Sequence, residues 1–115
     1  MADIAQVYNI EVKNNDYFKG VMFTFAINGS PLDLTGYSAR LHVRKTWDEY
    51  VIISLSTGNG LTITDAVSGK LSIDAQTFCA TPGIYKYDLE LRDGSGHAKT
   101  YVKGSFTVYE DITHD

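Results

Sequence analysis

The sequence predicts an all-β fold, an antiparallel β-sandwich around one core, on three observations. Apolar residues alternate with polar ones at a period of two along most of the chain. No stretch keeps helical i, i+3, i+4, i+7 spacing for more than about two turns. Gly, Pro, Asn and Asp recur roughly every ten residues, as they do between the short strands of a sandwich. The length of 115 residues predicts a single domain over residues 1–115.

Four strands are expected in the first half of the chain. The turns at residues 13–16 and 28–31 are rich in Asn, Asp, Gly and Pro, which favour chain reversal. Alternation is clearest where Ala39, Leu41 and Val43 face inward between polar neighbours, which predicts one solvated face. The expected strands cover residues 6–12, 18–27, 38–44 and 51–55. The expected inward faces are Tyr8, Ile10 and Val12 in the first strand and Val21, Phe23, Phe25 and Ile27 in the second.

The second half predicts a hairpin and two longer strands. The hairpin pairs residues 61–63 with residues 71–73 across the turn at 65–69. Residues 75–80 can hold a single helical turn. The two later strands are expected to face inward with Tyr85, Tyr87, Leu89 and Leu91 and with Val102, Gly104, Phe106 and Val108.

Tyr85 refines the predicted fold. It follows Pro82-Gly83-Ile84 at the entrance to a late strand. Immunoglobulin-like domains often place a tyrosine there, with its hydroxyl bonded to the backbone at the corner. The alternative interpretation is an ordinary core aromatic. The sequence therefore predicts an immunoglobulin-like antiparallel β-sandwich of seven to eight strands.

Composition and motifs disfavour several functions. The formal net charge of −4 disfavours nucleic acid as the main partner. No apolar run approaches the roughly 18 residues that cross a bilayer, and the first residues lack the pattern of a signal peptide. We therefore expect synthesis in a cytoplasm and no role in a membrane. His42, His97 and His114 lack ligand spacing, and Cys79 is expected to be a small buried thiol. We therefore expect no enzyme activity, no metal and no cofactor.

Candidate partner contacts lie where apolar or charged residues fall in loops, edges and arms. Residues 1–5 and 110–115 are expected to be flexible arms. Tyr8 and Ile10 can anchor the amino-terminal stretch to a neighbour. Exposed aromatics in the loop after the third strand also fit a carbohydrate-binding module, which is an alternative of a different class. The candidate interface is Tyr8, Ile10, Trp47, Tyr50, Asp111 and Ile112.

Several segments together resemble a family of small immunoglobulin-like domains of tailed-phage virion proteins, including the amino-terminal domain of baseplate upper proteins. The Asp-Leu-Thr-Gly turn at 33–36 and the Gly-x-Tyr-x-Tyr-Asp-Leu strand at 83–89 are distinctive as a pair. The order and spacing of the matching pieces cover about residues 17–113. These pieces are residues 31–36, 37–44, 69–73, 82–91, 104–108 and 111–113.

The resemblance implies a virion structural protein, tail- or baseplate-associated, that docks other phage subunits and carries no catalytic residues. Sheet edges with free backbone groups suit that role, and self-association is a further expectation. Family members often continue into a helical or fibre region, whereas this sequence ends soon after its last strand, so a separate subunit is expected. A capsid decoration or head-fibre protein is the alternative within the same class.

Overall fold

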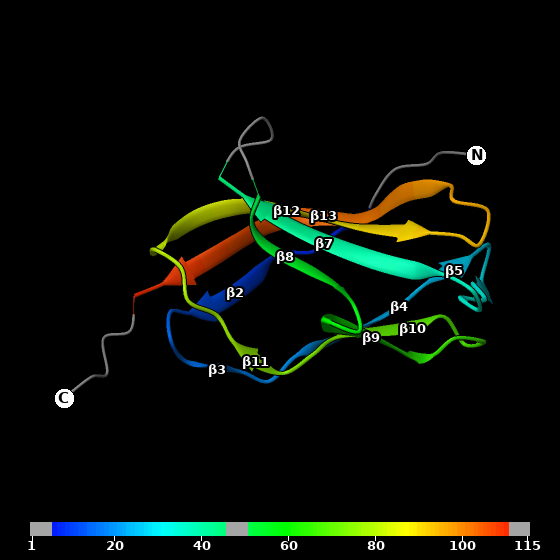
Figure 1. The fold of residues 1–115 in the computed structure, drawn as a ribbon, viewed down its shortest axis with the longest axis horizontal. Helices are drawn as coiled ribbons and strands as arrows, with labels where there is room; N and C mark the ends of the chain where they lie inside the picture. The colour runs from blue at the N-terminus through cyan, green and yellow to red at the C-terminus, as the bar shows by residue number, and fades with distance from the viewer. Residues whose placement is uncertain (1–5, 46–50, 111–115) are drawn as a thin grey trace.

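A computed structural model describes residues 6–45 and 51–110, which form strands and turns without a helix (Figure 1). The arms predicted at 1–5 and 110–115 lie outside this part of the chain, except for Glu110. The strands are β1 (Gln6–Val7), β2 (Ile10–Lys13), β3 (Tyr17–Phe18), β4 (Val21–Thr24), β5 (Ala26–Ile27), β6 (Ser30–Pro31), β7 (Ser38–Arg44), β8 (Val51–Thr57), β9 (Gly60–Asp65), β10 (Lys70–Ile73), β11 (Gln76–Thr77), β12 (Gly83–Arg92) and β13 (Ala98–Tyr109).

Nine of the described strands form one mixed sheet in the order β1-β13-β12-β7-β8-β9-β10-β4, with β2 also beside β13. The expectation of purely antiparallel pairing is wrong at two places. Both β1 and β2 run parallel to β13, and β8 runs parallel to β9 over two residue pairs. The amino-terminal strands pair with the last strand rather than with a chain neighbour, which local periodicity does not encode.

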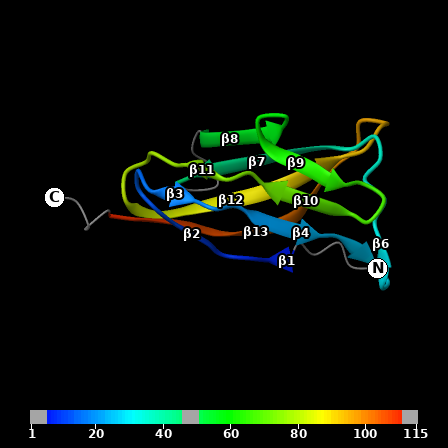
Figure 2. The ribbon, with the colours of Figure 1, turned by 90° about the horizontal axis from the view of Figure 1, so that it is seen from below.

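The sheet curls, so that β12, β13, β7 and β8 lie across the molecule from β4, β10 and β9 (Figures 1 and 2). Apolar side chains from both limbs fill the space between them, and each fully buried one stabilises the fold by roughly 1.5–3 kcal/mol. The two-stranded sheet of β3 and β11 joins this core through Phe78, whose ring lies 5.3 Å from that of Phe106. The largest fully buried side chains are Tyr87, Phe106, Leu34, Leu41, Leu61, Leu71, Ile73, Leu89, Leu91, Val43 and Val108.

Alternation correctly predicts the strands that build the core. In β7 and β12 every second side chain is buried, and the expected hairpin is the antiparallel pair β9–β10. The predicted corner is also present, because the Tyr85 hydroxyl donates to the Thr81 carbonyl at 2.5 Å. This bond fixes the entrance to β12 and removes the alternative in which Tyr85 is only a core aromatic.

The expected strand at 18–27 is wrong as one element. Gly20, with φ of +95°, interrupts it, and a β-carbon there would lie 2.6 Å from the Ile73 carbonyl. Beyond β4 the chain turns at Phe25 into the separate hairpin β5–β6, which leaves Ile27 44% exposed instead of in the core. A backbone conformation that glycine tolerates therefore overrides the apolar alternation.

Two further expectations fail around residue 77. The helical turn at 75–80 is instead strand β11, which pairs antiparallel with β3. Cys79 is exposed rather than buried, because its neighbour Phe78 occupies the core and the extended chain turns the next side chain outward.

Candidate docking surfaces

The amino-terminal strands are held against β13 at a glycine. Strands β1 and β2 keep one register, with Gln6 beside Val102 and Ile10 beside Phe106. Between them the backbone passes so close to Gly104 that a β-carbon there would lie within van der Waals overlap of the Tyr8 carbonyl. A side chain at this position would therefore push the amino-terminal edge away from the sheet.

A buried tyrosine uses the space that Gly104 leaves. Tyr87 lies opposite Gly104 in the sheet, and its hydroxyl donates to the Tyr8 carbonyl at 2.5 Å. Burial of the Tyr87 ring raises the pKa of its hydroxyl well above the usual value. Near neutral pH the hydroxyl is therefore protonated and can donate this bond.

Of the six residues of the predicted interface, two lie in different surroundings in the structure, and four lie outside its described part. Tyr8 is 44% exposed and its ring packs edge-on against Phe23, with 5.3 Å between ring centres. Ile10 is 2% exposed, so the expectation that it projects toward a partner is wrong: its side chain belongs to the core of this chain. Trp47, Tyr50, Asp111 and Ile112 lie outside the described residues.

The curled sheet has an open seam between its two edges. Among the described strands, β2 pairs only with β13 in the sheet, and β4 pairs only with β10. The outer backbone groups of β2 and β4 therefore face the seam. A groove of about 750 Å³ runs along it. Its lining comprises Glu11, Val12, Lys13, Asp16, Tyr17, Phe18, Lys19, Gly20, Val21 and Tyr109.

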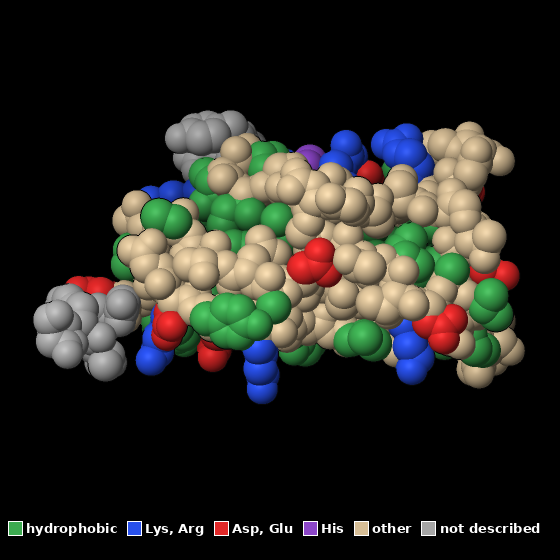
Figure 3. Space-filling model, turned by 60° about the horizontal axis from the view of Figure 1, so that its bottom comes forward, with side chains coloured by type: hydrophobic (Ala, Val, Ile, Leu, Met, Phe, Trp, Pro, Cys, Tyr) green, Lys and Arg blue, Asp and Glu red, His purple; other side chains and the backbone are tan. Residues whose placement is uncertain are grey.

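Two tyrosines stand at the groove with much of their surface in solvent. Tyr17 is 70% exposed and Tyr109 is 48% exposed. The Tyr109 hydroxyl donates to Glu11 Oε2 at 3.2 Å, and this bond raises the pKa of the hydroxyl. Figure 3 turns the β3 and β11 side forward and shows hydrophobic side chains set among polar surface, with charged side chains along the lower rim. Sequence reasoning missed the groove, although an aromatic pair directly after the 13–16 turn was a signal.

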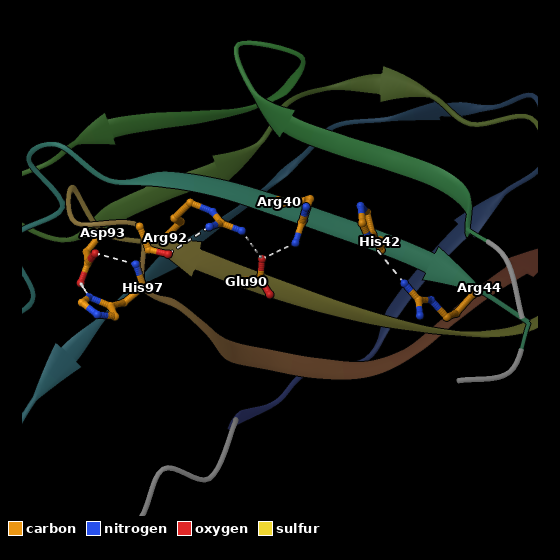
Figure 4. A network of polar contacts seen from close by, with 8 residues as sticks. Arg40, His42, Arg44, Glu90, Arg92, Asp93 and His97 are labelled. Atoms are coloured by element: carbon orange, nitrogen blue, oxygen red, sulfur yellow. Dashed lines mark hydrogen bonds and ion pairs between the residues drawn. The ribbon is translucent and has the colours of Figure 1, made fainter. Parts of the chain in front are cut away.

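A second surface is the outward face of β7 and β12, where charged side chains form cross-strand rows. Arg40 lies beside Glu90, and their side chains make an ion pair of 2.6 Å between Arg40 Nη2 and Glu90 Oε1. Arg92 Nη2 lies 4.0 Å from the same oxygen (Figure 4). In the next row, burial and the charge of Arg40 lower the pKa of His42. The imidazole is therefore largely neutral near pH 7.

The turn between β12 and β13 is closed by one carboxylate. Asp93 Oδ1 accepts the backbone N–H groups of Ser95 and His97, each at 2.9 Å. The His97 ring lies 3.5 Å from the other carboxylate oxygen (Figure 4). The bond from the His97 N–H is the main cause that lowers the pKa of Asp93.

Within residues 6–45 and 51–110, no three His, Cys, Asp or Glu side chains are grouped to share a metal ion. No helix in these ranges is long and apolar enough to cross a membrane. The described residues thus form an all-β domain with free sheet edges, an apolar groove and a charged sheet face.

The comparison with known families specifies this class further. The model of the BppU N-terminal domain, the amino-terminal domain of the baseplate upper protein, matches residues 3–114. The chain belongs to this family. It is thus a phage baseplate component of the virion, associated with other baseplate proteins, and its family is structural rather than enzymatic.

The fold is also similar to that of a solved crystal structure. The crystal structure of CopC from Methylosinus trichosporium OB3b superposes with a TM-score of 0.49 at 17% identity, covering 97% of this chain and 91% of that chain. No curated protein matches the sequence.

Proposed function

We propose that this domain docks a neighbouring baseplate subunit at the seam groove, by surface complementarity rather than by chemistry on a substrate. The observation that carries the proposal is the groove itself: Val12, Phe18 and Val21 line it, and the exposed Tyr17 and Tyr109 flank it. Tyrosine is enriched among interface hot spots because it adds a large apolar area and a hydroxyl. Membership of a baseplate family supplies the kind of partner.

The free edges support the same role. An extended segment of a partner could pair with the outer backbone groups of β2, as strand addition does in other complexes. The alternating charges of Glu11, Lys13, Asp16 and Lys19 around the groove supply polar contacts for its rim. Tyr8, half exposed at the same seam, extends the contact toward β1.

The test measures binding of purified chain to baseplates assembled without it. Tyr17→Ala should weaken binding by about 30-fold, because a hot-spot side chain contributes roughly 2 kcal/mol. Val67→Ala is the matched control, because Val67 is similarly exposed at 68% but lies in the β9–β10 turn. Urea unfolding confirms that both variants fold.

The outcomes separate the functions. Wild-type affinity in the double variant Tyr17→Ala, Tyr109→Ala would overturn the groove proposal. Binding to tailless heads rather than baseplates would favour capsid decoration, and binding to a glycan array would favour a carbohydrate-binding module.

We also propose the immunoglobulin-like sandwich as the finer description of the curled sheet. The Tyr85 corner bond and the two limbs around one core support it. In this description the parallel β8–β9 contact at Ser56 and Thr57 is a short link between two sheets. Hydrogen exchange tests this, because the amides of the link should then exchange faster than those in the middle of β12.

A further inference from the structure

The outward face of β7, β12 and β13 has the opposite charge sign to the chain as a whole. Its side chains alternate with the buried ones, so that they all point away from the core. Five are basic and two are acidic, which gives the face a formal charge of +3 in a chain whose formal net charge is −4. The basic side chains are Arg40, Arg44, Lys86, Arg92 and Lys103, and the acidic ones are Asp88 and Glu90.

A small hollow lies at one end of this face. It has a volume of about 180 Å³ and lies over β7, β8 and β12. Its polar lining consists of two guanidinium groups, three hydroxyl groups and one carboxylate. These belong to Arg40, Arg92, Ser38, Ser56, Thr57 and Glu90.

The two guanidinium groups have donors left over. Glu90 Oε1 accepts from Arg40 at 2.6 Å and lies 4.0 Å from Arg92, so one carboxylate serves two positive charges. Arg92 Nη1 also donates to the Gly96 carbonyl at 3.0 Å. A guanidinium group offers five N–H donors in a fixed fork, so each arginine can still donate to a further acceptor. Both side chains are 46% exposed, which leaves these donors within reach of solvent or a partner.

We propose that this hollow binds an aspartate or glutamate side chain on the acidic surface of a partner subunit. The planar fork of arginine matches a carboxylate in a bidentate manner, and the hydroxyl groups of Ser38, Ser56 and Thr57 can share its oxygens. The positive charges of Arg40 and Arg92 attract an acidic surface and orient it. Two arginines against one glutamate leave one positive charge, which one added carboxylate neutralises.

A nucleic acid fits this face less well. A phosphate backbone presents an extended row of charges, and here Asp88 and Glu90 interrupt the basic side chains. The observations therefore favour a protein partner.

This contact rests on the proposed docking role but uses none of the side chains of the seam groove. The groove variants should leave binding at the hollow unchanged, and variants at the hollow should leave the apolar contact unchanged. Failure of one proposal is therefore distinguishable from failure of the other.

The experiment titrates the labelled chain with a hexaglutamate peptide at low ionic strength and follows the backbone amide and arginine Nε–Hε signals by NMR. Arg40 and Arg92 signals should shift, and the double variant Arg40→Gln, Arg92→Gln should bind at least about tenfold more weakly. Lys70→Gln, on β10 of the other limb, is the matched control and should change affinity less than about twofold. Since exposed ion pairs contribute roughly 0–1 kcal/mol, the variants should stay folded, which urea unfolding verifies.

Results of three kinds would overturn the proposal. The first is the absence of peptide-induced shifts at Arg40 and Arg92, or an equal effect of Lys70→Gln. The second is tighter binding of a hexathymidylate than of the peptide at this face, which would indicate nucleic acid. The third is a dimer in sedimentation velocity that the double variant abolishes, because the acidic partner would then be a second copy of this chain.

Discussion

Replacing Gly104 by alanine should detach the amino-terminal edge of the sheet. The added β-carbon would overlap the Tyr8 carbonyl oxygen and lie 2.9 Å from Asn9 Oδ1. Both distances are shorter than ordinary van der Waals contact, and one of the two atoms belongs to backbone. The strands β1 and β2 would have to move away from β13 to accept the methyl group.

The expected loss of stability has two parts. Overpacking at a closely packed site costs about 1–3 kcal/mol. The same displacement breaks the bond from the Tyr87 hydroxyl to the Tyr8 carbonyl, and an unsatisfied buried hydroxyl costs about 1–3 kcal/mol more. The free energy of unfolding should therefore fall by about 2–6 kcal/mol, a large fraction of the total stability of a small domain.

Urea unfolding followed by circular dichroism measures this loss. Gly83→Ala is the matched control, because the nearest side-chain atom, on Tyr85, would lie 3.8 Å from its β-carbon. That variant should stay within about 0.5 kcal/mol of wild type. When Gly104→Ala is already present, the further change Tyr87→Phe should lower the free energy of unfolding much less than it does in the wild-type protein. A Gly104→Ala protein as stable as the Gly83→Ala protein would refute the reasoning.

Three other outcomes are expected. Tyr85→Phe removes the corner bond to the Thr81 carbonyl and should lower the free energy of unfolding by about 1–2 kcal/mol in urea, whereas no change would mean that the corner is not stabilising. The pKa of Asp93 is lowered in the folded state, so its carboxylate contributes stability that is present above the ordinary pKa of 3.8 and is lost as the pH falls through the lower folded value. The difference in urea midpoint between wild type and Asp93→Asn should therefore shrink toward pH 2. A difference that stays constant with pH would contradict this. Cys79 should react with Ellman's reagent in the native protein at a rate close to that in urea, whereas reaction only after unfolding would contradict its exposed position.

The core strands could be predicted from sequence because their information is local. In β7 and β12, alternate positions along the strand face the core and the solvent in turn. The Pro-Gly pair at the entrance to β12 identifies Tyr85 as a corner residue. These features depend on a few consecutive residues. The expected all-β fold and its resemblance to the baseplate family follow from the same segments.

The candidate surfaces depend on contacts between distant residues, which explains what was missed. Tyr8 and Ile10 are two positions apart, so alternation along a strand predicts that both side chains lie on the same face of the sheet. The passage over Gly104 separates them, so that Ile10 is buried while Tyr8 stays half exposed. Tyr17 borders the groove because the turn at 13–16 brings β3 back beside β2, and Tyr109 borders it because β13 pairs with β2. The first contact is local and could be predicted from the sequence, whereas the second joins distant parts of the chain, which the order of the residues does not indicate.

The parallel pairing of β1 and β2 with β13 has a mechanical consequence. Because the first and last strands run side by side in the same direction, the start of β1 and the end of β13 lie at opposite ends of their paired segment, with Gln6 beside Val102 and Tyr109 beside Lys13. Tension between those ends acts along the strands, and the evenly spaced rungs of a parallel ladder share the load instead of opening one after another. A pull on Gln6 and Tyr109 in opposite directions would therefore load this ladder in shear.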